Sequence, residues 1–170
     1  AILSLNGIVS SASVKIAGNA LDQDIIKYIR EKYKLLIGEK TAEDIKINFA
    51  NLYKPSKKEK LEIRGRDLIT GLPHAIEISQ EETKEAMMES INKMIKAIKN
   101  VLEQTPPELS ADIVEKGVIL TGGGALLKGL VEILEEELTI PVLIAETPLT
   151  CVAEGTGILL ENIKQLEQDQ

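Results

Sequence analysis

The stretch from Gly117 to Leu130, GVILTGGGALLKGL, constrains the fold more than any other part of the sequence. Val118-Ile119-Leu120 is a short apolar run suited to a buried strand, and Thr121 and three glycines follow it. From Ala125 onward, apolar residues recur at helical spacing. The stretch therefore predicts a strand, a glycine loop and a helix in direct succession.

The triplet Gly122-Gly123-Gly124 suits ligand binding, because glycine lets backbone N–H groups approach a ligand without side-chain obstruction. A helix N-terminus behind it adds unpaired donors and partial positive charge, so this corner can hold a phosphate or a nucleotide. Two common motifs do not fit. Leu130 stands where a Walker loop needs lysine, and Leu127 stands where the dinucleotide fingerprint needs its third glycine. A tight turn without a ligand is the alternative.

Composition narrows the possible classes of protein. With 170 residues, 44% of them hydrophobic, the chain can bury a core, as one domain or as a domain with an inserted lobe. A net charge of −7 disfavours a nucleic-acid backbone as partner. No uninterrupted apolar run approaches the roughly 18 residues of a transmembrane helix. Cys151 is the only cysteine and His74 the only histidine, which excludes an internal disulfide, a cysteine-based zinc cluster and a histidine-rich metal site.

Two features indicate where such a chain works and how complete it is. A single cysteine fits a reducing cytoplasm. The chain opens directly with the strand-like AILSL, without an initiator methionine or a targeting segment. We therefore expect it to be a piece of a longer protein.

The beginning of the chain predicts a hairpin and a helix. Two β-prone runs, 1–5 and 8–17, flank Asn6-Gly7, which is a strong hairpin signal. Apolar residues at helical spacing then predict an amphipathic helix that ends before Gly38. Asp22 and Asp24 lie near its start, where carboxylates are more typical of a helix terminus than of a metal site.

A second helix is expected to begin near Ala42, because Thr41 and Asp44 have the spacing of a capping box. Glu43 and Lys46 are three residues apart and so lie side by side on its surface. Taken alone, this pair is interpreted as a solvated ion pair.

The middle of the chain predicts a small α/β lobe and a long helix. The loop KPSKKEK at 54–60 carries four lysines and favours a flexible connection over a partner-binding patch. The runs 61–64 and 75–78 alternate as half-buried strands. Ser79 and Glu82 repeat the capping-box spacing and precede a long apolar stripe that stops at two consecutive prolines.

The remaining residues continue the α/β pattern. We expect a short helix around 109–115, a strand over 139–144, and a last helix that has Pro148 in its first turn and runs to Ile163. Gly155 and Gly157 lie inside that helix, where glycine lowers stability unless something packs closely. They are therefore interpreted as a close contact with a strand or a ligand.

Four stretches of the chain carry a family resemblance. They are LTGGGALL at 120–127, TPPEL at 105–109, RGRDL at 64–68 with TGLP at 70–73, and PLTCVAEG at 148–155. By their sequence, and by their order and spacing along the chain, these stretches resemble the MreB/Mbl family of bacterial actin homologues. The resemblance covers essentially the whole chain and matches the C-terminal half of that family.

The resemblance implies an α/β fold of the ribonuclease-H-like actin type. The chain would be the second large subdomain of that fold, with a small α/β subdomain inserted. The large subdomain would comprise residues 1–20 and 100–170, and the small subdomain residues 21–99. In this family ATP or ADP, with Mg²⁺, lies between the two halves of the complete molecule.

The resemblance also implies which residues meet the nucleotide. Those of the glycine motif that would face it are Gly122, Gly123, Gly124 and Ala125. Those of the lobe helix that would flank the adenine and ribose are Ala42, Glu43 and Lys46. The family's phosphate-gripping hairpins, metal-positioning aspartates and water-activating acid would lie upstream of Ala1. No catalytic residue and no metal ligand is therefore assigned, and we expect the 170-residue chain alone neither to hydrolyse ATP nor to bind it tightly.

The implied function is that of one half of a filament-forming, ATP-binding cytoskeletal protein that determines cell shape by organising cell-wall or envelope growth. It would polymerise head to tail, act with cell-shape or envelope proteins, and form membrane-associated filaments in the cytoplasm that touch the membrane only through the other half. Two alternatives stay open. One is a sugar or small-molecule kinase of the same superfold, and the other is a non-enzymatic interaction module that uses the lysine-rich loop 54–60.

Overall fold

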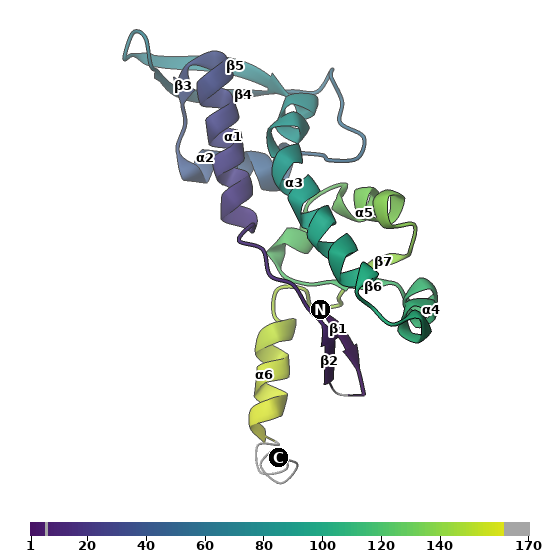
Figure 1. Cartoon of the computed structure of the whole chain (residues 1–170). Coiled ribbons are helices and arrows are strands. Elements are labelled where there is room, and N and C mark those ends of the chain that lie inside the picture. Colours follow the sequence, from purple (N-terminus) through teal and green to yellow (C-terminus); the bar gives the residue numbers. More distant parts are fainter. Residues whose placement is uncertain (6, 162–170) are drawn as a thin grey trace.

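The computed structural model of the chain describes residues 1–5 and 7–161, and Figure 1 shows an elongated molecule with two regions joined by one long helix. We call the upper region the lobe and the lower region the base. The joining helix, α3 (Gln80–Glu103), starts in the lobe and reaches the base. The ion pair between Lys99 and Glu137, at 2.7 Å, ties its lower half to α5 (Leu130–Leu138).

The lobe combines a three-stranded antiparallel sheet, ordered β3-β4-β5, with helices. Its elements are α1 (Gly18–Tyr33), β3 (Leu35–Leu36), α2 (Glu39–Asp44), the π-helix η1 (Ile45–Phe49), β4 (Lys60–Asp67) and β5 (Pro73–Ser79). The two predicted half-buried strands are confirmed as β4 and β5. Their alternation has a physical basis, because Ile63 and Ile78 point into the core while charged neighbours face solvent.

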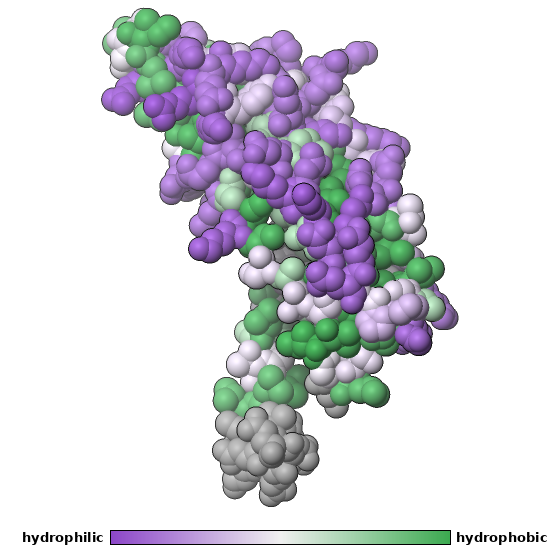
Figure 2. Space-filling view, viewed as in Figure 1, coloured by the Kyte–Doolittle hydropathy of each residue, from purple (hydrophilic) through white to green (hydrophobic). Residues whose placement is uncertain are grey.

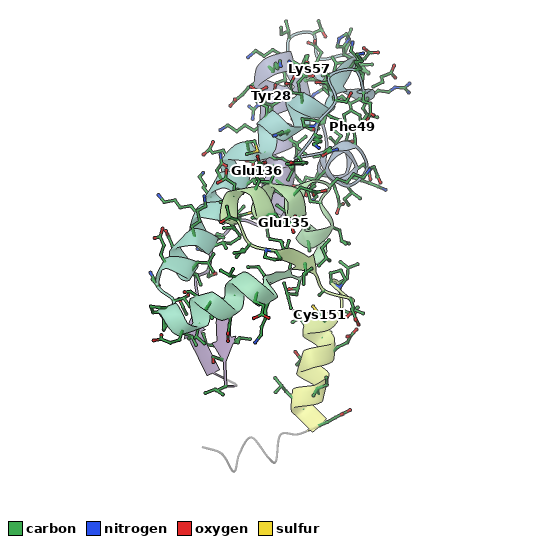
Figure 3. The ribbon with its side chains drawn as sticks, turned by 90° about the vertical axis from the view of Figure 1, so that its right-hand side faces the viewer. Tyr28, Phe49, Lys57, Glu135, Glu136 and Cys151 are labelled. Atoms are coloured by element: carbon green, nitrogen blue, oxygen red, sulfur yellow. The ribbon has the colours of Figure 1, made fainter. Side chains whose placement is uncertain are left out.

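The base contains two separate two-stranded sheets and three helices besides α3. β1 (Ile2–Ser4) pairs with β2 (Gly7–Ser10) antiparallel, and β6 (Val118–Leu120) pairs with β7 (Val142–Ile144) parallel. The other elements are α4 (Pro107–Lys116), the 3₁₀ turn η2 (Gly123–Leu126), α5 and α6 (Cys151–Glu161). In Figure 3, Cys151 marks the start of α6 and lies far from Tyr28 in the lobe.

One continuous apolar core runs through the lobe and into α5. Its fully buried members include Ile25 and Ile29 of α1 and Met87 and Ile91 of α3, the positions that the helical spacing predicts. Leu130 and Leu134 of α5 extend the same cluster. The core therefore crosses the expected subdomain boundaries without a break.

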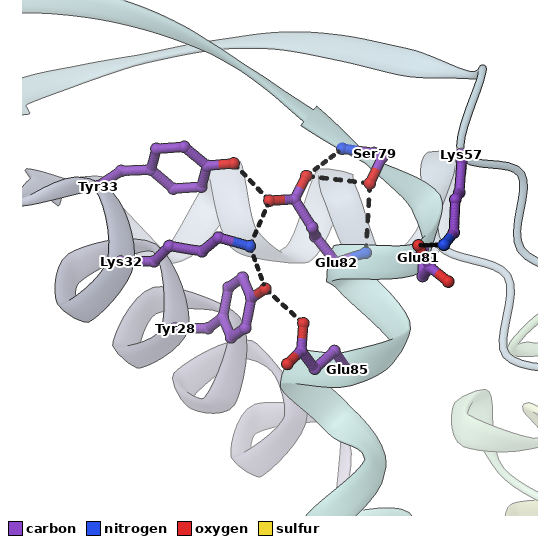
Figure 4. A network of polar contacts seen from close by, with 8 residues as sticks. All are labelled: Tyr28, Lys32, Tyr33, Lys57, Ser79, Glu81, Glu82 and Glu85. Atoms are coloured by element: carbon purple, nitrogen blue, oxygen red, sulfur yellow. Dashed lines mark hydrogen bonds and ion pairs between the residues drawn. The ribbon is translucent and has the colours of Figure 1, made fainter.

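The predicted capping box of α3 is confirmed. The Ser79 hydroxyl accepts a hydrogen bond from the backbone N–H of Glu82, and the Glu82 carboxylate accepts one from the backbone N–H of Ser79. The same carboxylate accepts a hydrogen bond from the Tyr33 hydroxyl and pairs with Lys32 at 2.8 Å, which joins the start of α3 to the end of α1 (Figure 4). Partial burial raises the pKa of Glu82, but the bonds from Lys32, Tyr33 and Ser79 outweigh burial and lower it to about 2.

The expected second helix begins earlier than predicted. α2 starts at Glu39 after Gly38, whose carbonyl accepts the N–H of Ala42 at 3.1 Å, so Thr41 already lies inside the helix. The capping box expected from Thr41 and Asp44 was wrong, because the first turn closes on backbone groups alone. The helix then widens into η1, where the Ala50 N–H donates to the carbonyl of Ile45, a bond that the sequence did not indicate.

The expected strand over 8–17 is shorter than predicted. β2 ends at Ser10 because β1 offers it only three residues to pair with, and Val14 beyond it is exposed. The antiparallel pairing of β1 with β2 confirms the hairpin, while Asn6 lies outside the described residues. In the last helix Pro148 precedes α6 by three residues instead of lying in its first turn, and Ile163 lies outside the described part of the chain.

Candidate functional site

The glycine triplet forms an open corner directly after β6. Gly122 has a φ of 81°, and its N–H donates to the carbonyl of Pro148 at 2.6 Å, which ties the corner to the segment before α6. A Cβ atom built on Gly122 or Gly124 would meet no described atom within 4 Å, and one on Gly123 would make only an ordinary contact with Leu149. The backbone of this corner is therefore uncovered, as the nucleotide hypothesis requires.

The helix behind the corner starts later than predicted. Ala125 belongs to the 3₁₀ turn η2, and α5 begins only at Leu130, after Gly129 with a φ of 83°. The expectation that a helix opens at Ala125 was therefore wrong, because the left-handed backbone at Gly129 interrupts it. The α-helical N-terminus thus stands several residues away from the triplet, and the donors nearest to the triplet belong to the 3₁₀ turn.

Gly129 brings the base against the lobe. The N–H of Leu52 donates to the carbonyl of Lys128 at 2.9 Å. A Cβ atom on Gly129 would lie 2.4 Å from the backbone nitrogen of Tyr53, so only glycine permits this approach. The segment that follows η1 is thereby fixed to the chain immediately after the glycine corner.

Two of the predicted site residues are buried. Ala42 is part of the apolar core, and Ala125, which directly follows the glycine triplet, is only 4% exposed. Neither side chain is therefore open to a ligand. Gly123, Gly124 and Glu43 are exposed, and so are open to a ligand.

Lys46 pairs with Asp22 and not with Glu43. The interpretation of Glu43 and Lys46 as a solvated ion pair was therefore wrong. Its ammonium group lies 2.8 and 2.9 Å from the two carboxylate oxygens of Asp22 on α1, and it donates to the carbonyl of Gly18 at 3.2 Å. The side chains of Lys46 and Asp22 are only 13% and 9% exposed. A buried carboxylate needs a counter-ion, so Asp22 attracts the lysine more strongly than exposed Glu43 does.

An open pocket of about 350 Å³ lies between the start of α1 and α2. Ligand pockets in proteins begin at about this size. Its walls are Asn19, Asp22 and Gln23 from α1, and Glu39, Lys40 and Glu43 from α2. Gln23 donates to Glu39 at 3.2 Å across the pocket edge. With three carboxylates and one lysine, these walls favour neutral groups that donate hydrogen bonds over phosphates.

The sequence analysis assigned no role to four of the six pocket residues, Asn19, Gln23, Glu39 and Lys40, and interpreted Asp22 as a helix-start residue. One feature of the sequence does indicate that Asp22 is buried. Asp22 stands three residues before Ile25 and seven before Ile29, which places an acid on the buried stripe of α1. Such an acid requires a partner, but the sequence does not show that the partner is Lys46, 24 residues away.

Other predicted features contribute nothing to a site. Lys57 and Lys60 of the 54–60 loop pair with Glu81 and Glu77, which reduces the positive charge that this loop offers to a partner. A Cβ on Gly155 or Gly157 would meet no described atom within 4 Å, so the expected close contact with a strand is absent from the described chain. The alternative, a contact with a ligand, stays a prediction. Over residues 1–5 and 7–161, no group of three or more acidic, histidine or cysteine side chains could hold a metal ion. No described helix is long and apolar enough to cross a membrane.

Comparison of the sequence with known proteins gives a match to the MreB/Mbl protein family over residues 1–168. The cell shape-determining protein Mbl of Bacillus cereus is 57% identical over 166 residues, which are 98% of this chain and 50% of that protein. The cell shape-determining protein MreB of Escherichia coli K12 is 48% identical over 163 residues, covering 96% and 47%. The chain therefore spans about half the length of the curated relatives it matches.

Solved structures show the same fold. The crystal structure of MreB5 of Spiroplasma citri bound to AMPPNP superposes with a TM-score of 0.89 at 40% identity, covering 98% of this chain and 50% of that one. A double helical filament of MamK has a TM-score of 0.68 at 23% identity, covering 85% and 46%. At that level of identity the MamK likeness shows the fold alone. The predicted actin-type α/β fold is confirmed.

Proposed function

Since the chain belongs to the MreB/Mbl family, we propose that it is the C-terminal half of an ATP-binding, filament-forming bacterial cytoskeletal protein that determines cell shape. The observation that carries this proposal is the uncovered glycine corner, on a fold shared with an MreB5 that was crystallised with AMPPNP. Bare backbone at Gly122 and Gly124 lets a flat base and sugar approach closely. Gly122, Gly123 and Gly124 would form the floor of the nucleotide site, and Ala125 would support it from below.

The pocket between α1 and α2 would take the nucleoside end of the same ligand. Glu43 lines the pocket, whereas Ala42 is buried in the core and Lys46 pairs with the lining residue Asp22. The walls are mainly acidic, so hydroxyl and amine groups suit them better than phosphates. The phosphate end would then point away from the lobe, toward the half of the protein that this chain does not contain.

No group of three or more acidic, histidine or cysteine side chains in residues 1–5 and 7–161 could hold a metal ion, and no metal ligand is assigned to this chain. Mg²⁺, if it accompanies the phosphates, would be held by the other half, and no catalytic step is assigned to this chain. Polymerisation head to tail, contacts with cell-shape or envelope proteins, and a cytoplasmic, membrane-associated location belong to the same proposal for the full-length protein.

The test is a side chain placed in the open space of the corner. Gly124→Val adds atoms where nothing lies within 4 Å, so the fold should persist while the floor is blocked. We expect the affinity of the full-length variant for ATP to fall about tenfold or more, the size of effect that losing a close contact of about 1.4 kcal/mol produces. Sedimentation with ATP should fall in parallel.

Gly155→Val is the matched control, because its Cβ also meets no described atom within 4 Å but lies in α6. It should bind ATP as the unchanged protein does. Unchanged ATP affinity in a folded Gly124→Val variant would contradict the proposed floor. Robust ATP turnover by the isolated 170-residue chain would contradict the placement of catalysis in the other half.

A further inference from the structure

The helix that lines the pocket continues without a break into a π-helical turn. α2 supplies three residues to the pocket wall, and η1 follows it directly. At the end of η1 the N–H of Ala50 donates to the carbonyl of Ile45 at 2.9 Å, whereas an α-helical turn would direct it to the carbonyl of Lys46. The turn therefore holds one residue more than an α-helical turn does.

The upper end of η1 is fixed to α1. Lys46 is the second residue of η1, and its ammonium group is held by the Asp22 carboxylate and by the carbonyl of Gly18. We call these contacts of Lys46 the upper anchor. Because Asp22 also lines the pocket, the upper anchor belongs to the pocket wall. Ile45 beside it is fully buried, so apolar packing holds the same end of η1.

The segment that leaves η1 is fixed to the base. Leu52 is 0% exposed, and its N–H donates to the carbonyl of Lys128. The backbone of Tyr53 lies so close to Gly129 that no larger residue fits there. We call this pair of contacts the lower anchor. Since Lys128 and Gly129 lie between the glycine corner and α5, the lower anchor joins the lobe to the base.

The two anchors are not independent, because one short segment carries both. Leu52 follows Lys46 by six positions. Each residue of an α-helix adds about 100° of rotation and about 1.5 Å of rise. A turn with one residue fewer would therefore carry Leu52 away from Lys128 if Lys46 stayed on Asp22. The π turn thus sets the spacing at which both anchors form, and such turns occur frequently at functional sites.

We propose that η1 couples the wall of the pocket to the junction between lobe and base, so that displacing Lys46 at the upper anchor loosens the Leu52–Lys128 contact at the lower one. A molecule that orders the pocket wall would tighten the junction through the same turn. That this molecule is a nucleotide rests on the proposed function, whereas the coupling through η1 does not.

The test measures hydrogen exchange of the Leu52 N–H in the full-length protein. Without nucleotide, Lys46→Met breaks the upper anchor and should speed this exchange by about fivefold or more, the lower end of typical couplings between sites. Glu82→Gln is the matched control, because it breaks a part-buried network elsewhere in the lobe and should change the exchange of Leu52 much less. Should Lys46→Met not fold with Asp22 unpaired, adding Asp22→Asn removes both charges and carries the same test.

Deletion of Ile47 tests the π turn itself. Ile47 is 55% exposed, so its deletion returns the turn to the α-helical residue count with little loss of buried surface. The two anchors then no longer form together, and adding Lys46→Met should not speed the exchange of Leu52 further. Ile47→Ala removes the same side chain but keeps the residue count, so it should respond to Lys46→Met as the unchanged protein does.

Two results would overturn the coupling. One is an unchanged exchange rate of Leu52 in Lys46→Met, and the other is an equal response to Lys46→Met with and without Ile47. If the deletion variant does not fold, the comparison of Lys46→Met with Glu82→Gln decides, and equal rates in these two variants would overturn the proposal.

Adding ATP separates this inference from the function beneath it. In the unchanged protein, saturating ATP should slow the exchange of Leu52 by about fivefold or more, and deletion of Ile47 should abolish that effect. If ATP binds but the exchange of Leu52 does not change, the inference fails and nucleotide binding stands. If ATP does not bind, the proposed function fails, and the exchange of Leu52 in Lys46→Met without ATP decides the coupling.

Discussion

The lobe and the base are built from the same kinds of pattern, yet most of the exposed large apolar side chains of the described residues lie in the base. The lobe exposes such side chains only at Ile47 and in the 68–72 turn. In the lobe, large side chains such as Ile25, Leu35 and Ile78 are almost fully buried. In the base, Leu3, Ile119 and Val152 on three different elements are largely exposed. Figure 2 shows a mostly hydrophilic surface over the lobe, apart from an apolar tip at the top, and further apolar patches lower down.

This contrast shows that an apolar face in the sequence predicts burial but does not indicate which element covers that face. The lobe packs a three-stranded sheet against α1 and α3, which closes a core. Each sheet of the base has only two strands, and an isolated hairpin such as β1–β2 is marginally stable in water. The sheet of β6 and β7 joins the core through Val142. We therefore expect the stability of the 170-residue chain to reside in the lobe, and the base to open first.

The largest expected difference comes from one matched pair of isoleucines. Ile91 in α3 is 0% exposed and Ile119 in β6 is 64% exposed. Ile91→Ala should lower the free energy of unfolding by about 2–5 kcal/mol, because it removes buried atoms and leaves a cavity. Ile119→Ala should lower it by about 0.5 kcal/mol or less. Urea unfolding followed by circular dichroism measures both, and equal losses would break the comparison.

The junction between the two regions should be nearly as sensitive. Gly129→Ala places a Cβ 2.4 Å from the backbone of Tyr53 and forces alanine to a φ of 83°. We expect a loss of about 2–4 kcal/mol, from strained backbone and from displacement of the 51–53 segment. Hydrogen exchange should show faster exchange at Leu52, whose N–H bonds to Lys128. Unchanged protection at Leu52 would show that the lobe holds this segment without the base.

The polar network at the top of the lobe should make its stability depend on pH. The pKa of Glu82 is lowered to about 2 from 4.5, so the folded state holds its proton more weakly than the unfolded state. This contribution is fully present above about pH 4.5 and is lost as the pH falls through about 2. Glu82→Gln should cost about 1–2 kcal/mol at pH 7 and flatten the urea midpoint between pH 5 and pH 2.5.

Glu81→Gln provides the control for this experiment, since Glu81 is an exposed neighbour paired with Lys57 at 3.2 Å. It should leave both the stability at pH 7 and the pH profile close to those of the unchanged chain. A profile that flattens equally in both variants would mean that the network in Figure 4 is not the source of the dependence.

The smallest expected effect is a gain in the base. Gly155 lies inside α6 with no described atom within 4 Å of its Cβ position, so Gly155→Ala should stabilise that helix by about 0.5–1 kcal/mol. If the base stays folded until the lobe unfolds, this gain raises the urea midpoint of the whole chain. If the base opens first, the gain appears only as slower amide exchange in α6, and this is the outcome that we expect.

Local signals in the sequence predicted a large part of the fold. Three such signals are confirmed: the capping box at Ser79, the apolar stripe of α3 and the alternation in β4 and β5. Each depends on residues that are close to one another in the sequence. The family resemblance supplied the actin-type fold, which the superposition on MreB5 confirms.

The candidate site was harder to predict because its contacts join distant residues. Lys46 reaches Asp22 across 24 positions, and no spacing rule distinguishes that partner from nearby Glu43. The widening of α2 into η1 and the backbone turn at Gly129 also depend on packing between segments far apart in the chain. The roles of the glycines, of Ala42 and Ala125, and of Glu43 and Lys46 toward a nucleotide stay predictions, as do the subdomain boundaries.

The long helix α3 has a mechanical consequence. Its 24 residues span about 36 Å at 1.5 Å per residue, and its two ends are anchored in different regions, by the Ser79 cap above and the Lys99–Glu137 pair below. A tilt of about 5° at the cap would displace the far end by about 3 Å on that length. The helix is thus a lever arm, through which a small rocking of the lobe over a bound molecule would be amplified before it arrives at α4 and the two prolines beside it.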